Sequence, residues 1–206
     1  MIGAASSKTT ASWTVGSGNG GLDTGSIANT TWYHFYEIVR PDTGVVDYIF
    51  STSASSPTLP ANYTLYRRIG SGRTDGSAHW LAFTQYRDKF IWAAAVVDLS
   101  NGASTSASRT LQTLTVPTGV VVTALFRGNV SASAVTYRFS SPAENDVAVT
   151  AGQNTDLGNG SAAVTLGGQF QVVTNTSAQI GVRSPGAAGA GLYLETYGWI
   201  DDRGKQ

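Results

Sequence analysis

Residues 31–50, TWYHFYEIVRPDTGVVDYIF, decide the fold of this chain. Two runs of aromatic and β-branched residues, which suit a half-buried pleated surface, flank the turn-forming segment RPDTG. The pattern predicts a long β-hairpin. Its first run alternates, with Trp32, His34, Tyr36 and Ile38 on one face and Tyr33, Phe35 and Glu37 on the other. Both faces carry large residues, so we expect one to pack the core and the other to meet a covering layer or a neighbouring subunit.

Strand-like runs recur along the rest of the chain and are separated by segments rich in Gly, Pro, Asn and Ser. They lie near residues 63–69, 79–85, 90–97, 110–116, 120–127, 135–139, 161–173, 177–183 and 192–200. No segment shows ten or more residues of helical periodicity. The sequence predicts an all-β protein, a single jelly-roll-like antiparallel β-sandwich of about ten to twelve strands.

The domain boundaries follow from the same pattern. We expect a flexible lead-in over residues 1–12, one β-sandwich domain over residues 13–200 and a charged tail over residues 201–206. Loop tips are predicted at residues 70–76, 101–108 and 184–191, which are rich in Gly, Ser and Ala.

Composition excludes several classes of function. The chain of 206 residues has 13 basic and 13 acidic residues, so no overall field favours nucleic acid. It has no Cys, which excludes disulfides, thiolate catalysis and Cys-bound metals. No apolar run approaches the roughly 20 residues of a membrane helix, so membrane insertion is not expected. The first residues, MIGAASSKTT, lack the pattern of a signal peptide.

Two Asp-Thr-Gly triplets raise the hypothesis of an aspartic protease, which needs two carboxylates sharing one proton. Asp23 follows a glycine-rich segment rather than a hydrophobic strand, and Asp42 sits at the tip of the predicted hairpin. The triplets are nineteen residues apart, not in two duplicated halves. Turn formation is the preferred interpretation of both.

No other motif indicates catalysis, a cofactor or a metal. His34 and His79 lie beside aromatic residues in predicted strands, which favours packed or surface histidines. Residues 154–160, NTDLGNG, resemble an oxygen-rich calcium loop but lack the closing Glu, so a surface loop is expected. No G-x-S-x-G motif is present. We therefore assign no catalytic, cofactor-binding or metal-binding residue.

Aromatic residues are the remaining candidates for recognition, because their rings can stack on the apolar faces of sugars. They are also the residues that build a core or a subunit interface. The candidates for ligand or subunit contact are Trp32, Tyr33, Tyr36, Trp80, Tyr86 and Trp92.

Several motifs together resemble a module of tailed-phage and prophage virion proteins, of the tail-fibre, head-fibre or capsid-decoration type. They include GLDTGS at residues 21–26, WYH at 32–34, DTG at 42–44 and VD at 46–47. They continue as FSTS at 50–53, PTLP at 57–60, RRIG at 67–70, TNTSAQI at 174–180 and GWID at 198–201. The resemblance covers residues 13–204, nearly the whole chain.

The resemblance implies a non-enzymatic virion structural protein on the surface of the particle, on its head or tail. It implies a homotrimer that contacts other virion proteins. A host-surface glycan is a further candidate partner. Longer members of the family carry an additional segment before the position of Trp13. A lectin-like carbohydrate-binding module is the alternative, and a hydrolase, which would need a carboxylate pair, ranks below it.

Overall fold

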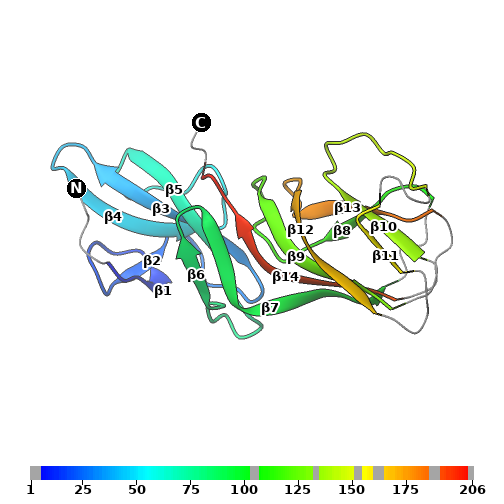
Figure 1. The fold of residues 1–206 in the computed structure, drawn as a ribbon. Coiled ribbons are helices and arrows are strands. Elements are labelled where there is room, and N and C mark those ends of the chain that lie inside the picture. Colours follow the sequence, from blue (N-terminus) through cyan, green and yellow to red (C-terminus); the bar gives the residue numbers. More distant parts are fainter. Residues whose placement is uncertain are drawn as a thin grey trace. The chain divides into compact units, whose positions relative to one another are not determined.

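The computed structural model describes residues 6–102, 107–131, 135–150, 155–159, 165–185 and 191–203. Every regular element in these ranges is a β-strand, and the strands form three sheets (Figure 1). The predicted all-β class is confirmed, with fourteen strands in these ranges. The chain groups into two compact units, residues 1–81 with 203–206 and residues 82–202, where the sequence led us to expect one domain.

The first unit is built on one five-stranded sheet with the strand order β1-β2-β4-β3-β5. β1 and β2 pair in parallel, as do β2 and β4, whereas β3 is antiparallel to both β4 and β5. The strands are β1 (Thr9–Ser12), β2 (Gly20–Leu22), β3 (Trp32–Arg40), β4 (Val45–Ser51) and β5 (Leu65–Arg73). The lead-in expected over residues 1–12 therefore contains a paired strand, β1.

β3 and β4 form the predicted hairpin. Their pairing runs without a break from His34 opposite Ser51 to Arg40 opposite Val45. Gly44 closes the turn with φ of 70°, in the left-handed region that glycine adopts without steric cost. Its N–H donates to the Arg40 carbonyl at 2.8 Å.

Large residues on both faces of this hairpin are buried under other segments of the same chain. On one face, Tyr36, Ile38 and Ile49 are buried with Tyr63, and Trp13 and Leu59 pack against them. On the other face, Leu22, Tyr33 and Phe50 are buried, with Ile27, Phe35 and Trp80 packed against them. The alternation read from the sequence is correct, and the covering layers are connecting segments of the same chain.

The loop tip expected over residues 70–76 is wrong in its first half. Gly70 and Ser71 belong to β5, and the fully buried Ser71 hydroxyl lies 2.9 Å from His34 Nδ1. These small residues serve a packed sheet interior rather than a reversal of the chain. The reversal comes at Asp75, whose carboxylate accepts hydrogen bonds from two following backbone amides. The other two expected tips include residues 103–106 and 186–190, which lie outside the described residues.

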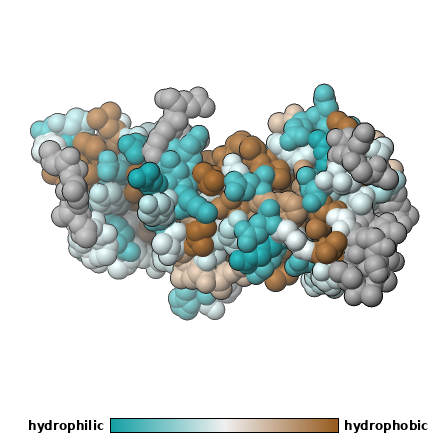
Figure 2. Space-filling view, in the orientation of Figure 1, coloured by the Kyte–Doolittle hydropathy of each residue, from teal (hydrophilic) through white to brown (hydrophobic). Residues whose placement is uncertain are grey.

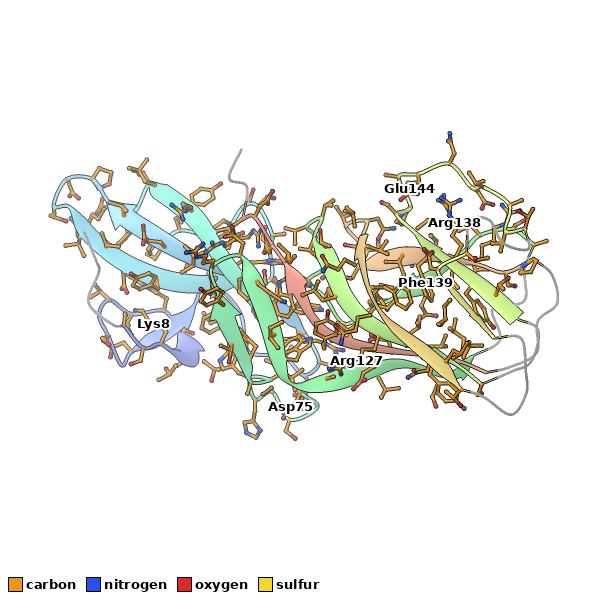
Figure 3. All side chains as sticks on the ribbon, viewed as in Figure 1. Lys8, Asp75, Arg127, Arg138, Phe139 and Glu144 are labelled. Atoms are coloured by element: carbon orange, nitrogen blue, oxygen red, sulfur yellow. The ribbon has the colours of Figure 1, made fainter. Side chains whose placement is uncertain are left out.

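A buried ion pair joins Lys8, in the segment before β1, to Asp47 of β4. The side chains of Lys8 and Asp47 are 8% and 4% exposed, and their charged atoms are 2.9 Å apart. Lys8 Nζ also donates to the carbonyls of Thr14 and Gly16. The Asp47 carboxylate accepts from the amides of Gly16 and Tyr48. Both charges are thus fully satisfied by the protein (Lys8 is labelled in Figure 3).

Substitution of Asp47 by Ala should destabilise the first unit by about 3–5 kcal/mol, because it leaves the Lys8 ammonium buried without its counter-charge. Urea unfolding followed by tryptophan fluorescence would measure the loss. Asp42→Ala is the control, since the Arg40–Asp42 pair is solvent-exposed and its removal should leave the midpoint almost unchanged. Equal midpoint shifts for the two variants would contradict the assigned role of the buried pair.

The second unit contains two antiparallel sheets. The larger has the order β12-β9-β14-β7-β6 and the smaller has the order β11-β10-β13-β8. The larger comprises β6 (Phe83–Tyr86), β7 (Lys89–Gly102), β9 (Thr123–Val130), β12 (Leu166–Val173) and β14 (Leu192–Ile200). The smaller comprises β8 (Thr110–Thr113), β10 (Val135–Ser140), β11 (Leu157–Asn159) and β13 (Gln179–Arg183).

Aromatic rings join these two sheets into a sandwich. Phe139 of β10 is 5.2 Å from Phe126 of β9 and 4.9 Å from Phe170 of β12, measured between ring centroids (Figure 3). Phe126 is completely buried. The sandwich-like architecture expected from the sequence is therefore present within the second unit.

A second aromatic cluster fixes the pairing of β7 and β14. The rings of Phe90 and Trp199 stack with centroids 4.9 Å apart and an interplanar angle of 5°. Trp92 packs against the same indole. Gly198 lies against β7 so closely that a Cβ atom there would collide with the Phe90 carbonyl oxygen. The absence of a side chain at Gly198 is what allows this close approach.

Replacement of Gly198 by Ala should cost about 1–3 kcal/mol or more, because a backbone carbonyl cannot move aside as a flexible side chain can. Thermal unfolding monitored by near-ultraviolet circular dichroism would report both the stability and the Phe90–Trp199 stack. Gly76→Ala is the matched control, since its Cβ would enter open space. A Gly198 variant as stable as this control would refute the close-packing argument.

Candidate functional site

The structure does not bring the predicted aromatic candidates together in one site. Tyr33 and Tyr36 are 1% exposed and belong to the two opposite hairpin clusters of the first unit. Trp80 packs edge-on against Tyr33 and Phe50 and is partly buried, and Trp32 is also partly buried. Tyr33, Tyr36 and Trp80 are therefore largely structural.

The other two candidates belong to the second unit and differ from each other. Trp92 is 4% exposed and its indole N–H donates to the Thr115 carbonyl at 3.1 Å, so it is a core residue. Tyr86, in the short strand β6, is 71% exposed. Tyr86 is thus the one member of the predicted set that stands fully on the surface.

The two protease-like carboxylates are engaged in turns. Asp23 accepts hydrogen bonds from the amides of Thr24 and Thr58, and Asp42 pairs with the Arg40 guanidinium at 2.8 Å. The pKa of Asp42 is lowered, mainly by its hydrogen bond with Arg40. Asp23 adjoins the Phe50 end of β4 and Asp42 lies beyond its Val45 end, so roughly 15–20 Å of strand separates them. They cannot share a proton in this arrangement.

The histidines also lie apart. His34 is buried in β3, whereas the side chain of His79 is 80% exposed in the reversal after β5 and lies 3.7 Å from the Asp75 carboxylate (Figure 3). The strand expected around His79 begins only at Phe83. Within the described ranges, no three His, Asp or Glu side chains are grouped to hold a metal ion. Part of the calcium-like segment 154–160 lies outside those ranges.

The best candidate for a site is the outward face of the five-stranded sheet in the second unit. β14 alternates along its length, with Leu192, Leu194 and Thr196 buried. Tyr193 and Glu195 point to the opposite, solvent-facing side. Hydrophilic and hydrophobic residues lie side by side on the face of the second unit seen in Figure 2.

The strand register arranges this face in rows. In one row, Asn129 of β9 lies between Gly167 of β12 and Tyr193 of β14. In the next row, Arg127 of β9 lies between Gln169 of β12 and Glu195 of β14. The Asn129 amide, the Tyr193 ring and the charged pair Arg127–Glu195 are therefore neighbours on one face of the sheet.

An open groove of about 500 Å³ lies along these rows. Its volume is within the range typical of small-molecule sites. Polar groups converge on it from Asn129, Tyr193 and Glu195, and β7 adds the apolar Val97 and Leu99. Leu194, Ser131 and Thr165 complete the lining.

Charge in and beside the groove is internally balanced. Arg127 Nη1 lies 3.3 Å from Glu195 Oε2, and the Arg127 guanidinium lies 5.0 Å from the centre of the Tyr197 ring (Arg127 is labelled in Figure 3). The ion pair and the cation–π contact together hold Arg127 against the sheet. Because none of the described lining residues is basic, the groove has no unpaired positive charge to attract an anion.

Gly167 creates the space in which the Asn129 side chain lies. A Cβ atom at position 167 would collide with Asn129 Oδ1, the far end of a movable side chain. The glycine therefore sets the position of the amide without contributing a group of its own.

The sequence carries one signal for this site, in a segment that contains none of the six aromatic candidates. The segment LYLETYGWI alternates with period two, and this pattern alone places Tyr193 and Glu195 on the same face of a strand. The contribution of Asn129 and the space left by Gly167 depend on strand register, which the sequence alone does not specify.

Comparison of the chain with protein-family models, with curated proteins and with solved structures found no match. In the described part of the chain, no helix has the length and apolar character needed to cross a membrane.

Asp98 lies directly behind the groove. It sits between Val97 and Leu99 on β7 but points to the inner side of the sheet. Thr115 Oγ1 donates to its carboxylate at 2.6 Å, and Thr196 Oγ1 donates a second, short hydrogen bond. Burial raises the pKa of Asp98, and the two hydroxyl donors offset only part of this effect. Among the described residues no cation pairs with it, so the folded protein holds the Asp98 proton more tightly than the unfolded chain does.

Replacing Asp98 by Asn should change how stability depends on pH. The pKa of Asp98 is higher in the folded state than in the unfolded state. Its contribution to the free energy of unfolding is therefore greatest below about pH 3.9 and is lost as pH rises through the folded-state pKa. The amide imitates the neutral acid, so the variant should gain stability relative to the wild type as pH rises above about 4. Urea midpoints of both proteins across this range would measure the difference. Parallel curves would contradict the prediction, since all other carboxyl groups titrate alike in both proteins.

Proposed function

We propose that this chain is a non-enzymatic structural protein of a tailed-phage particle, exposed on its head or tail, where it contacts host-surface glycans. Support for the particle comes from the resemblance of residues 13–204 to virion modules. Support for a binding role comes from one observation, the groove on the outward sheet face with its convergent amide, phenol and carboxylate groups.

A lectin-like carbohydrate-binding module that acts without a particle is the second candidate. The same groove favours it, because the geometry of the groove does not depend on where the protein resides. The two functions share the binding chemistry and differ in location and assembly. A homotrimer bound to other virion proteins belongs to the first candidate only.

Particles produced by the strain that encodes this chain should contain it as a stoichiometric component. Mass spectrometry of gradient-purified particles would detect the chain, and antibody labelling in electron micrographs would assign it to head or tail. Light scattering of the purified protein should give about three times the chain mass of 21.5 kDa.

Absence of the chain from particles that carry all their other proteins would refute the virion proposal. A stable monomer at micromolar concentration would refute the trimer. Either result would leave the lectin-like module as the better account of the groove.

A further inference from the structure

We infer that the groove on the outer face of the second unit binds an uncharged hexopyranose, with the Tyr193 ring as its stacking platform. The inference rests on the proposed contact with glycans and assigns it to a site. Within the groove an apolar strip from Val97 and Leu99 lies beside polar groups from Asn129 and Glu195. A pyranose presents the same combination, with C–H groups on one face of its ring and hydroxyl groups around its edge.

The hydrogen-bonding groups of the groove are available to a ligand. In the part of the chain that the structure describes, the side chains of Asn129, Tyr193, Ser131 and Thr165, which line the groove, form no hydrogen bond with one another or with the rest of the protein. By contrast, the exposed Tyr66 of the first unit donates its hydroxyl to the Ser55 carbonyl at 3.1 Å. The Asn129 amide both donates and accepts, and the Glu195 carboxylate accepts, so the two groups together can serve adjacent sugar hydroxyls.

The charge of the site selects for a neutral ligand. Glu195 Oε2 is occupied by Arg127, which leaves Oε1 free to accept from a hydroxyl. None of the described lining residues is a cation, and the guanidinium of the neighbouring Arg127 is already held by Glu195 and the Tyr197 ring. A sialylated or sulfated sugar would approach Glu195 without a cation to compensate it, so we expect such sugars to bind less well.

Gly167 acts here as a positioning residue. It makes room for the Asn129 amide in the row that also contains Tyr193. A methyl group at position 167 displaces the amide while the backbone remains unstrained, because Gly167 does not occupy the left-handed region. The binding effect of Gly167→Ala should therefore resemble that of Asn129→Ala.

The test uses the full-length chain and an array of neutral oligosaccharides of glucose, galactose, mannose and N-acetylhexosamines, with sialylated and sulfated counterparts. The strongest neutral binder would then be titrated by calorimetry against the variants. Tyr193→Ala should weaken binding about tenfold or more, through loss of the stacking surface. Gly167→Ala and Asn129→Ala should each weaken it severalfold.

Tyr86→Ala is the matched control. It removes an exposed ring that lies on the same sheet but outside the groove lining, so this variant should bind as the wild type does.

Three outcomes would each overturn the inference. They are that the folded wild-type protein binds no neutral sugar, that the Tyr86 and Tyr193 variants lose equal sugar affinity, or that the protein prefers the anionic sugars. Dissociation of an oligomer by Tyr193→Ala, without any glycan binding by the wild type, would identify the face as a subunit contact instead. Circular dichroism of each variant would check that the fold is intact. None of these results bears on whether the chain is present in particles, which mass spectrometry decides separately.

Discussion

The second unit depends on the pairing of β14 along both of its edges, with β9 on one side and β7 on the other. A strand paired on both sides cannot rotate, so its alternation assigns every side chain to a face. Leu192, Leu194 and Thr196 enter the sandwich, and Tyr193 and Glu195 must then face solvent. The groove is thus a consequence of the same register that builds the core, and no separate loop is needed to display its central residues.

Glycine allows close approach at two points of this sheet, with different effects. At Gly198 the neighbour is the backbone of β7, so the site admits no side chain without moving a strand. At Gly167 the neighbour is the tip of Asn129, so a side chain would be accepted and the amide would move. The first glycine therefore constrains the fold, whereas the second constrains only the surface that the fold presents.

Sequence patterns predicted much of the fold because they report local physics. The hairpin of residues 31–50, its turn and its two-faced alternation are all present in the structure, as is the all-β class. The Gly70–Ser71 segment was misread because small residues signal turns and tight packing alike. The candidate site was missed because size and aromaticity select core residues: Tyr33, Tyr36 and Trp92 are all buried. What distinguishes Tyr193 is its row partners, and these are set by long-range register.

The covered hairpin also bears on how copies of the chain could associate. Residues 13, 59 and 63 pack against one face and residues 27 and 80 against the other, so the buried half of the hairpin has no surface left for a neighbouring subunit. Near the turn the situation differs, because Val39 is flanked across the strands by Val46 and Leu65, which are 50% and 57% exposed. A trimer contact on the hairpin would therefore have to use its turn end, where apolar surface remains open to solvent.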